Sequence, residues 1–194
     1  MFPSFPRRLS LLLLCLILAF PAGSPASRFA LPQTGIAAVD TPAPAHKGRA
    51  AAVTRVTAAG LFDYPVIQNG DSAPSAADTV GQYAAAARRG SIGLLAHNHS
   101  AGRSFFVFSI GDLITLTFDD GSTQSYEVTA IHIYQATDPD DFSQPFLDDR
   151  GKELKAKEVF NREYSPGTLT FQTCIAKDGH SSWGLLFIRA EPVK

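Results

Sequence analysis

The sequence predicts a mainly β fold, either a closed barrel or a sandwich. Short segments in which apolar residues alternate with polar ones, or follow one another, recur from residue 91 onward. These segments are residues 91–97, 112–118, 125–134, 168–174 and 183–193. Asp119 to Ser122 (DDGS) supplies a hairpin turn between the second and the third. Several short strands with one or two helices between them are typical of such folds.

The amino-terminal part of this domain adds one strand and one helix to the prediction. The first strand is expected near Val53 (AVTRV). Residues 80–90 (VGQYAAAARRG) predict a helix, because alanine dominates the segment and Gly90 would stop it. Asp78 or Thr79 would cap the start of this helix.

An acidic stretch and a second expected helix lie between the third and the fourth segment. Residues 137–151 show no regular period, whereas residues 152–164 have apolar positions at helical spacing. The aspartates of this region could coordinate calcium, but they lack the EF-hand pattern, so a solvated loop is favoured. They are Asp138, Asp140, Asp141, Asp148 and Asp149.

Length and charge exclude several classes of protein. The chain has 194 residues, a formal net charge of −1 and an apolar fraction of 45%, which suits a single domain with a substantial core. This charge balance gives no basic footprint for nucleic acid and no polybasic patch for anionic lipid. His99, His132 and His180 are scattered, so they give no ligand spacing for zinc, and we expect them at the surface or in loops. We expect a monomer without a nucleic-acid partner.

Residues 1–27 have the pattern of a secretory signal peptide. Arg7 and Arg8 supply positive charge, an apolar run covers Leu9 to Phe20, and small residues follow. The run is shorter than the roughly 20 residues that a bilayer-spanning helix needs, so removal is favoured over retention as an anchor. We therefore expect a secreted or extracytoplasmic protein, with retention at the membrane by an uncleaved signal segment as the alternative.

Residues 28–52 are expected to form a linker, and residues 53–194 the folded domain. The linker is rich in Ala, Pro and Thr and shows neither strand nor helix periodicity, as expected of a flexible segment. It contains Leu31 to Gly35 (LPQTG), a pentapeptide of the form L-P-x-T-G. Chance alone would produce such a match in well under about one per cent of chains of this length.

Cysteine use leaves one thiol to explain. Cys15 lies in the expected signal peptide, so removal of that segment leaves Cys174 alone in a protein bound for an oxidising compartment. Three explanations fit an unpaired cysteine there: an intermolecular disulfide, a buried and inert thiol, or a nucleophile.

Two segments of the chain carry a resemblance to a known family. GLLAHNHSAG places His97 at the end of an apolar strand, and TLTFQTC places Cys174 at the end of another, followed by SSWGLLFIRAEP. Together with Gly111-Asp112 before a strand, this order and spacing resemble the sortase family over about residues 60–193. The resemblance implies a closed eight-stranded β-barrel with one or two short helices, and a cysteine transpeptidase without metal or organic cofactor.

The resemblance also implies roles for these two residues. Cys174 would attack the threonine carbonyl of an LPxTG-like sorting signal and form a thioester, which an amine acceptor or water would resolve. His97 would act as general acid for the leaving amine and as base for the acceptor. Strand alternation places Cys174 on the same face as Thr170 and Gln172, away from the core, where a substrate could reach it.

The sequence departs from the family at one functional position. The family's third catalytic residue is an arginine that stabilises the oxyanion, and the motif places Leu185 there. Arg189 lies about 13 Å farther along the same strand, so Arg103, in the loop after His97, is the better substitute. Losing one oxyanion donor costs on the order of 100- to 1,000-fold in rate. Further candidates for the oxyanion site or the substrate groove are Thr173, Asn98 and Trp183.

Three functions remain open at this point. The first is a sortase-like cysteine transpeptidase or peptidase, atypical because of Leu185. The second is a catalytically impaired sortase-fold domain that binds peptide or surface polymer without turnover. The third is a small structural β-protein whose thiol is incidental. LPQTG (Leu31–Gly35) would be an internal pseudo-substrate for the chain's own groove, or else a coincidental linker sequence.

Overall fold

The computed structural model describes residues 52–194. The expected signal peptide, and the expected linker up to residue 51 with its LPQTG sequence, lie outside the described residues. No helix in the described part of the chain is long and apolar enough to cross a membrane.

Strands dominate the described chain, with two short α-helices and one 3₁₀ segment between them. In chain order the elements are β1 (Val53–Ala58), β2 (Phe62–Gln68), β3 (Val80–Gln82), α1 (Ala84–Ala87), β4 (Ile92–Leu95), η1 (Ala101–Val107), β5 (Leu113–Phe118), β6 (Thr123–Ala136), β7 (Phe146–Leu147), β8 (Glu153–Leu154), α2 (Ala156–Glu163), β9 (Leu169–Lys177) and β10 (His180–Pro192).

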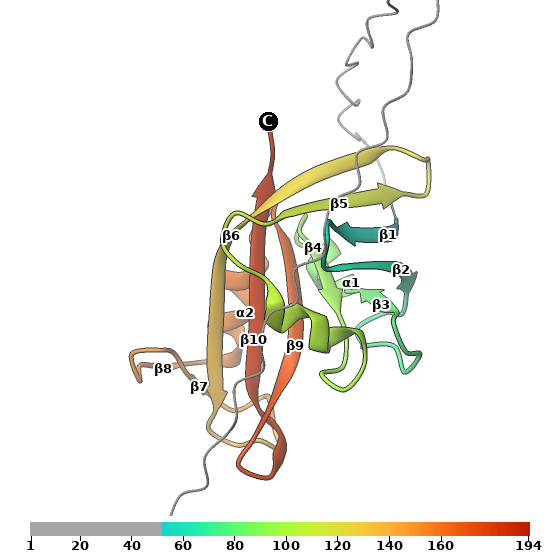
Figure 1. Cartoon of the computed structure of the whole chain (residues 1–194). Helices are drawn as coiled ribbons and strands as arrows, with labels where there is room; N and C mark the ends of the chain where they lie inside the picture. Colours follow the sequence, from blue (N-terminus) through green and yellow to red (C-terminus); the bar gives the residue numbers. More distant parts are fainter. Residues whose placement is uncertain (1–51) are drawn as a thin grey trace, which may run out of the picture. The chain divides into compact units, whose positions relative to one another are not determined.

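Eight of the strands close into a barrel. They follow one another in the order β10-β9-β4-β3-β2-β1-β5-β6, and a pairing of β10 with β6 joins the two ends. β7 and β8 extend the sheet on the far side of β6. The expected mainly β, closed eight-stranded barrel is confirmed. Figure 1 shows β9 and β10 as the long central pair, which ends in a hairpin at the bottom of the view.

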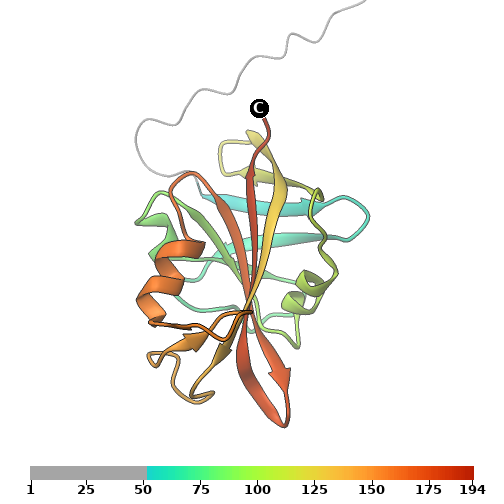
Figure 2. The same ribbon diagram turned by 90° about the vertical axis from the view of Figure 1, so that its left-hand side faces the viewer.

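Two apolar clusters lie on opposite faces of the long strands β6, β9 and β10. The inner cluster fills the barrel and includes Leu169 and Phe171 of β9. The outer cluster lies between these strands and α2, and it includes Tyr134, Leu185 and Phe187. Figure 2 shows α2 on one side of the long strands and η1 on the other. The outer strand face is therefore covered by a second core.

A β-bulge allows β6 to contribute to both clusters. The register of β6 against β10 shifts at Thr129, which is an extra residue in the ladder. Such a shift reverses which side chains of the strand face the barrel. Val128 accordingly belongs to the inner cluster and Tyr134 to the outer cluster, although regular alternation would place both on one face.

The helix expected over residues 80–90 is largely wrong. The first part of that segment is β3, which pairs with β2 and β4, and α1 covers only the four alanines. Strand pairing prevails over the alanine-rich composition because Val80 is fully buried, and because the Gln82 side chain accepts a hydrogen bond from the Val53 N–H at 2.8 Å.

The cap expected for that helix is wrong as well. Tyr83, and neither Asp78 nor Thr79, precedes the first helical residue, and its side chain makes no capping hydrogen bond. Gly90 follows the helix with φ of +75°, a conformation that glycine adopts without strain.

The second expected helix is shorter than its pattern predicts. α2 begins at Ala156, and the start of the expected segment forms β8 instead. β8 pairs with β7, which lies within the stretch 137–151 expected to be irregular. β2 and η1 were not expected, because neither has a clear period in the sequence.

Candidate active site

Cys174 lies near the middle of β9, on the face of the strand that looks away from the barrel interior. Its ladder partner on β10 is Leu185, and its side chain packs against the outer apolar cluster. The thiol is free and half-buried. The cysteine is therefore a single thiol at the border between the second core and the surface.

His97 follows β4, which runs parallel to β9. The last ladder pair of these two strands joins Leu95 to Gln172, and the Ala96 N–H still donates to the Gln172 carbonyl at 3.3 Å. Continued for two residues, this register places His97 beside Cys174 and on the same outer face. The fold thus brings the ends of the two motif segments onto neighbouring strands.

A tight loop holds the backbone of His97. Its carbonyl accepts hydrogen bonds from the N–H groups of Ser100 and Gly102, each at 3.0 Å. A Cβ added to Gly102 would lie 2.6 Å from that carbonyl oxygen and would collide with the Thr173 hydroxyl. Only glycine fits this close approach. The imidazole itself stacks on His99, with ring centroids 5.2 Å apart.

Thr173, a candidate for the oxyanion site, is directed away from Cys174. Its side chain is buried and lies against Gly102 of η1, on the inner side of β9. Within the described residues its hydroxyl oxygen has no hydrogen-bond partner. The Thr173 side chain therefore packs η1 onto the strand and does not line the face that carries the thiol.

The thiol lies in an apolar environment. Burial raises the pKa of Cys174, and a hydrogen bond from the Ser182 side chain opposes this effect. His97 is not among the groups that shift the pKa of this thiol. Hydrogen bonds between catalytic groups are often long in ligand-free proteins and shorten when substrate binds.

Leu185, which the sequence motif aligns with the expected arginine, is 6% exposed. It lies between two ladder partners, Cys174 on β9 and Tyr134 on β6. An apolar cavity of about 290 Å³ opens beside it. The cavity is lined by Tyr83, Phe142, Phe146, Ala156, Val159, Phe160, Tyr164, Gln172, Leu185 and Phe187. The side chain across the ladder from Cys174 is thus an apolar leucine and not a cation.

The two arginines considered as substitutes have other partners. Arg103 is 68% exposed on η1 and forms a 3.9 Å ion pair with Asp78. Arg189 contacts Glu191 at 3.3 Å and lies four residues along β10 from Leu185. Neither guanidinium is among the groups that shift the pKa of the Cys174 thiol.

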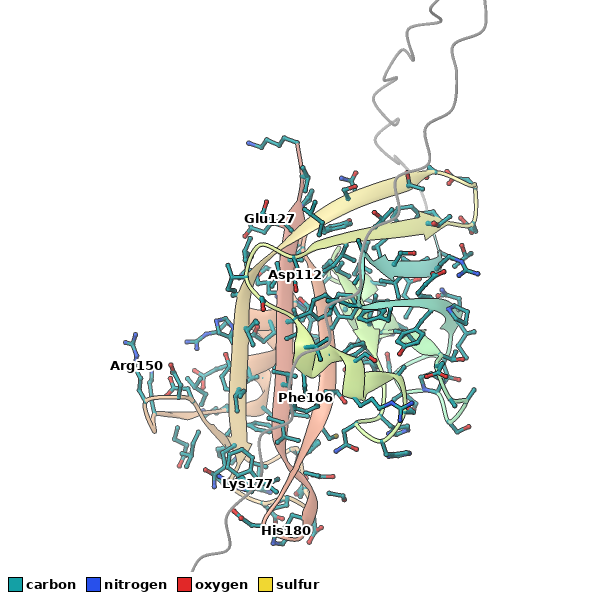
Figure 3. All side chains as sticks on the ribbon, in the orientation of Figure 1. Phe106, Asp112, Glu127, Arg150, Lys177 and His180 are labelled. Carbon is teal, nitrogen blue, oxygen red and sulfur yellow. The ribbon has the colours of Figure 1, made fainter. Side chains whose placement is uncertain are left out.

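Asn98 and Trp183 brace the β9–β10 hairpin. The Asn98 amide donates to the Ser181 carbonyl at 3.1 Å, which ties the loop after His97 to β10. The Lys177 ammonium lies 4.5 Å from the centre of the Trp183 ring. Lys177 and His180 mark the tip of this hairpin in Figure 3.

A buried polar cluster on the same outer face was missed by sequence reasoning. Glu163 of α2 is fully buried, and both of its carboxylate oxygens lie 3.0 Å from His132 Nδ1. The Tyr134 hydroxyl donates to the same carboxylate at 2.5 Å. His132 was expected at the surface or in a loop and lies instead on β6, half-buried. Glu163 follows buried Val159 by one helical turn, and an acid on an apolar helix face signals a buried partner.

The aspartates of the acidic region bind their own loops. Asp141 accepts from the Ser143 N–H and from the Gln144 amide, and Asp148 accepts from the N–H groups of Arg150 and Lys152. Arg150 extends away from the barrel at the tip of the β7–β8 hairpin (Figure 3). Among residues 52–194, no group of three or more His, Cys, Asp or Glu side chains could hold a metal ion.

Comparison with known proteins places the chain in a family. The model of the sortase domain matches residues 55–193. No curated protein matches the chain. Similar solved structures include sortase C from Clostridium perfringens SM101 (15% identity, TM-score 0.46, covering 73% of this chain and 70% of that one). Another is sortase C1 from Streptococcus suis, with 16% identity and a TM-score of 0.47, covering 73% of this chain and 73% of that one. A sortase D5 transpeptidase from Clostridium perfringens has 14% identity and a TM-score of 0.47, covering 74% of this chain and 79% of that one. With the family model matching most of its length, this chain belongs to the sortase family, whose members are cysteine transpeptidases.

Proposed function

We propose that the chain is a secreted cysteine transpeptidase that cleaves an LPxTG-like peptide through a thioester on Cys174. The observation that supports this proposal is the parallel pairing of β4 with β9, because its last pair, Leu95 with Gln172, lies two residues before both His97 and Cys174. Family membership supplies the reaction class, and a single free thiol beside an apolar cavity supplies the nucleophile and a place for a peptide.

Each proposed step forms one bond, breaks another and transfers a proton through His97. The Cys174 thiolate attacks the threonine carbonyl, the bond from threonine to glycine breaks, and His97 gives its proton to the leaving amine. An incoming amine, or water, then attacks the thioester while His97 accepts a proton, and the thiolate leaves. No metal or organic cofactor takes part in these steps.

The apolar cavity suits the hydrophobic side chain of a sorting-type peptide. Leu185 and Gln172, the same-face neighbours of Cys174, line this cavity together with aromatic rings. A peptide whose threonine carbonyl lies at the sulfur would place its preceding residues along this wall. Burial of one leucine side chain there would contribute roughly 2 kcal/mol to binding.

We also propose that LPQTG (Leu31–Gly35) is a substrate mimic for the same groove. A linker of this length reaches roughly 20 Å or more, which is comparable to the size of the domain. N-terminal sequencing of the secreted protein tests the idea. A new terminus at Gly35 that is lost in Cys174→Ala supports self-cleavage, and an intact LPQTG in active enzyme contradicts it.

Leu185 favours a second candidate function. A groove that keeps its apolar cavity but has no guanidinium beside the thiol could bind a peptide or surface polymer without turnover. In that case Cys174→Ala would leave peptide affinity unchanged, and no cleavage would accompany binding in the wild type.

Turnover of a fluorogenic LPxTG peptide by the purified protein distinguishes the two functions. The transpeptidase is expected to release the fragment beginning at glycine and to form an amide with an added amine. Cys174→Ala abolishes this release, and His97→Ala lowers it by about 100-fold or more. Cleavage that persists in Cys174→Ala would eliminate the proposed mechanism.

A further inference from the structure

Part of one edge of β6 has no partner strand. β5 pairs with β6 up to Glu127, and β7 pairs with it only from Gln135 onward, while β10 pairs with the opposite edge along the whole stretch. Residues 129–134 (TAIHIY) therefore present a free strand edge about 20 Å long. Figure 1 shows this stretch of β6 at the left border of the long strands, between β5 and β7.

The alternation of backbone bonds indicates which groups face this free edge. In an antiparallel strand, alternate residues direct both their N–H and their C=O groups to the same edge. The Thr137 N–H donates to the Pro145 carbonyl, so Thr137 faces the edge that pairs with β7. Two and three pairs of residues back along β6, Ile133 and Ile131 face this same edge. Their backbone groups therefore point away from β10, where no strand receives them.

The free edge opens into a cavity of about 430 Å³. Residues 131–134 form one side of the cavity, and residues 148–152 of the β7–β8 hairpin supply most of the rest. Ile131 and Ile133 are 36% and 47% exposed. The stretch 129–134 contains neither Lys nor Pro, two residues that commonly prevent an edge from accepting a further strand. Space and unpaired backbone thus suit a short peptide in extended conformation.

The lining of this cavity has an excess of positive charge. Arg150, Lys152 and Arg162 line it, and within residues 52–194 none of these three forms an ion pair. Asp148 and Asp149 line it as well, but Asp148 already accepts hydrogen bonds from the N–H groups of Arg150 and Lys152. An acidic ligand would provide the cations with partners.

We propose that the free edge of β6 (residues 129–134) binds an extended acidic peptide as an added strand. Backbone hydrogen bonds to Ile131 and Ile133 supply affinity, and acidic side chains next to the cations supply specificity. The chain's own residues 28–51 do not have this charge, because they contain three Lys or Arg residues and one Asp. This site goes beyond the reaction proposed for Cys174 and does not depend on it.

Fluorescence anisotropy with the full chain and labelled synthetic peptides tests the proposal. The probes are Glu-Val-Glu-Val-Glu-Val and its counterpart with lysine in place of glutamate. The glutamate peptide should bind about tenfold or more tightly than the lysine peptide. N-methylation of one alternate set of its residues removes the donors that face β6 and should weaken binding about tenfold. N-methylation of the other set is the matched control and should change the affinity little.

Amide hydrogen exchange and charge variants locate the bound peptide. Saturation with the glutamate peptide should slow exchange of the Ile131 and Ile133 N–H groups by about tenfold or more. Combining Arg150→Ala with Lys152→Ala should weaken binding of this peptide about fivefold. Lys157→Ala, on the exposed face of α2 and outside the cavity, is the matched control and should bind as the wild type does.

Four results would overturn the inference. The first is no detectable binding of the glutamate peptide. The second is equal affinity for this peptide and both of its N-methylated forms, which would reduce the effect to attraction between charges. The third is slow exchange of Ile131 and Ile133 in the dilute full chain without peptide, which would assign the edge to the chain's own residues. The fourth is a dimer that protects the same two amides, which would assign it to a second copy.

Discussion

Two titratable clusters occupy the same outer face of the long strands, and they are built in opposite ways. Cys174 has a leucine across the ladder, and burial raises the pKa of its thiol. Glu163, on the helix that covers the same face, has a histidine and a tyrosine on its carboxylate. The ionisable partners therefore serve the attachment of α2, and the side chain across the ladder from the proposed nucleophile is apolar.

This difference separates the surroundings of the thiol from the attachment of the helix. Leu185 belongs to the outer cluster and lines an apolar cavity, so the side chain across the ladder from Cys174 carries no charge. Glu163 attaches α2 to His132 and Tyr134 of β6 and so keeps the outer cluster covered. Stability of the outer cluster and reactivity of the thiol should consequently respond to different substitutions.

The largest effect on stability is expected for Glu163, which attaches α2 to β6. Glu163→Ala removes the only acceptor described for the Tyr134 hydroxyl and leaves a cavity, so the free energy of unfolding should fall by about 3 kcal/mol. Urea denaturation measures this loss. Lys157→Ala on the exposed face of α2 is the control and should change stability by less than about 0.5 kcal/mol. Equal stability of the two variants would show that Glu163 does not hold α2 against β6.

A charge placed beside the thiol should exchange stability for reactivity. Leu185→Arg introduces a guanidinium into the outer cluster and should lower the free energy of unfolding by about 2 kcal/mol. The cation lowers the pKa of Cys174, so alkylation at neutral pH should become about tenfold faster. Leu185→Met keeps the volume without the charge and serves as the control. An unchanged alkylation rate in Leu185→Arg would mean that the missing cation does not limit the thiol.

In the wild type, the pH profile of the thiol reports its apolar surroundings. Burial raises the pKa of Cys174, so the thiolate fraction at neutral pH is small and the alkylation rate should climb through the alkaline range. Mass spectrometry of the protein after timed exposure to iodoacetamide measures this. A profile that reaches its plateau at neutral pH would contradict the burial seen in the structure.

The smallest effect is expected from His132, which is partly exposed. Its hydrogen bond to Glu163 raises the pKa of His132, with burial opposing. A raised pKa in the folded state means that the contribution of this pair to stability is complete below the unfolded pKa and is lost as pH rises through the folded one. Thermal unfolding across this range should show a decline that His132→Asn removes. A parallel decline in that variant would assign the pH dependence to other groups.

The sequence was sufficient for the mainly β fold and for the alternation along β9, and the family resemblance selected a closed barrel over a sandwich. Leu169 and Phe171 lie in the barrel core and Cys174 on the opposite face, as alternation requires. The motif segments around His97 and Cys174 predicted membership of the sortase family, which the match to the sortase-domain model confirms. These features depend on local patterns that a single chain displays directly.

The rest depends on pairing that no local pattern contains. β3 lies in an alanine-rich segment because its neighbours in the sheet bury Val80. The apolar alternation of β6 indicates which residues are buried, but the bulge decides which core receives them, so the role of His132 could not be foreseen.

The extra residue in β6 also determines which genetic changes the molecule can absorb. Deleting Thr129 would leave every ladder pair of β6 with β10 in place, because Ala130 would then follow Val128 directly in one unbroken alternation. Deleting a residue of the regular ladder beyond the bulge would instead shift Tyr134 by one position and turn it away from the outer cluster. A codon lost at the bulge would thus spare both cores, whereas one lost a few positions later would disrupt the outer one.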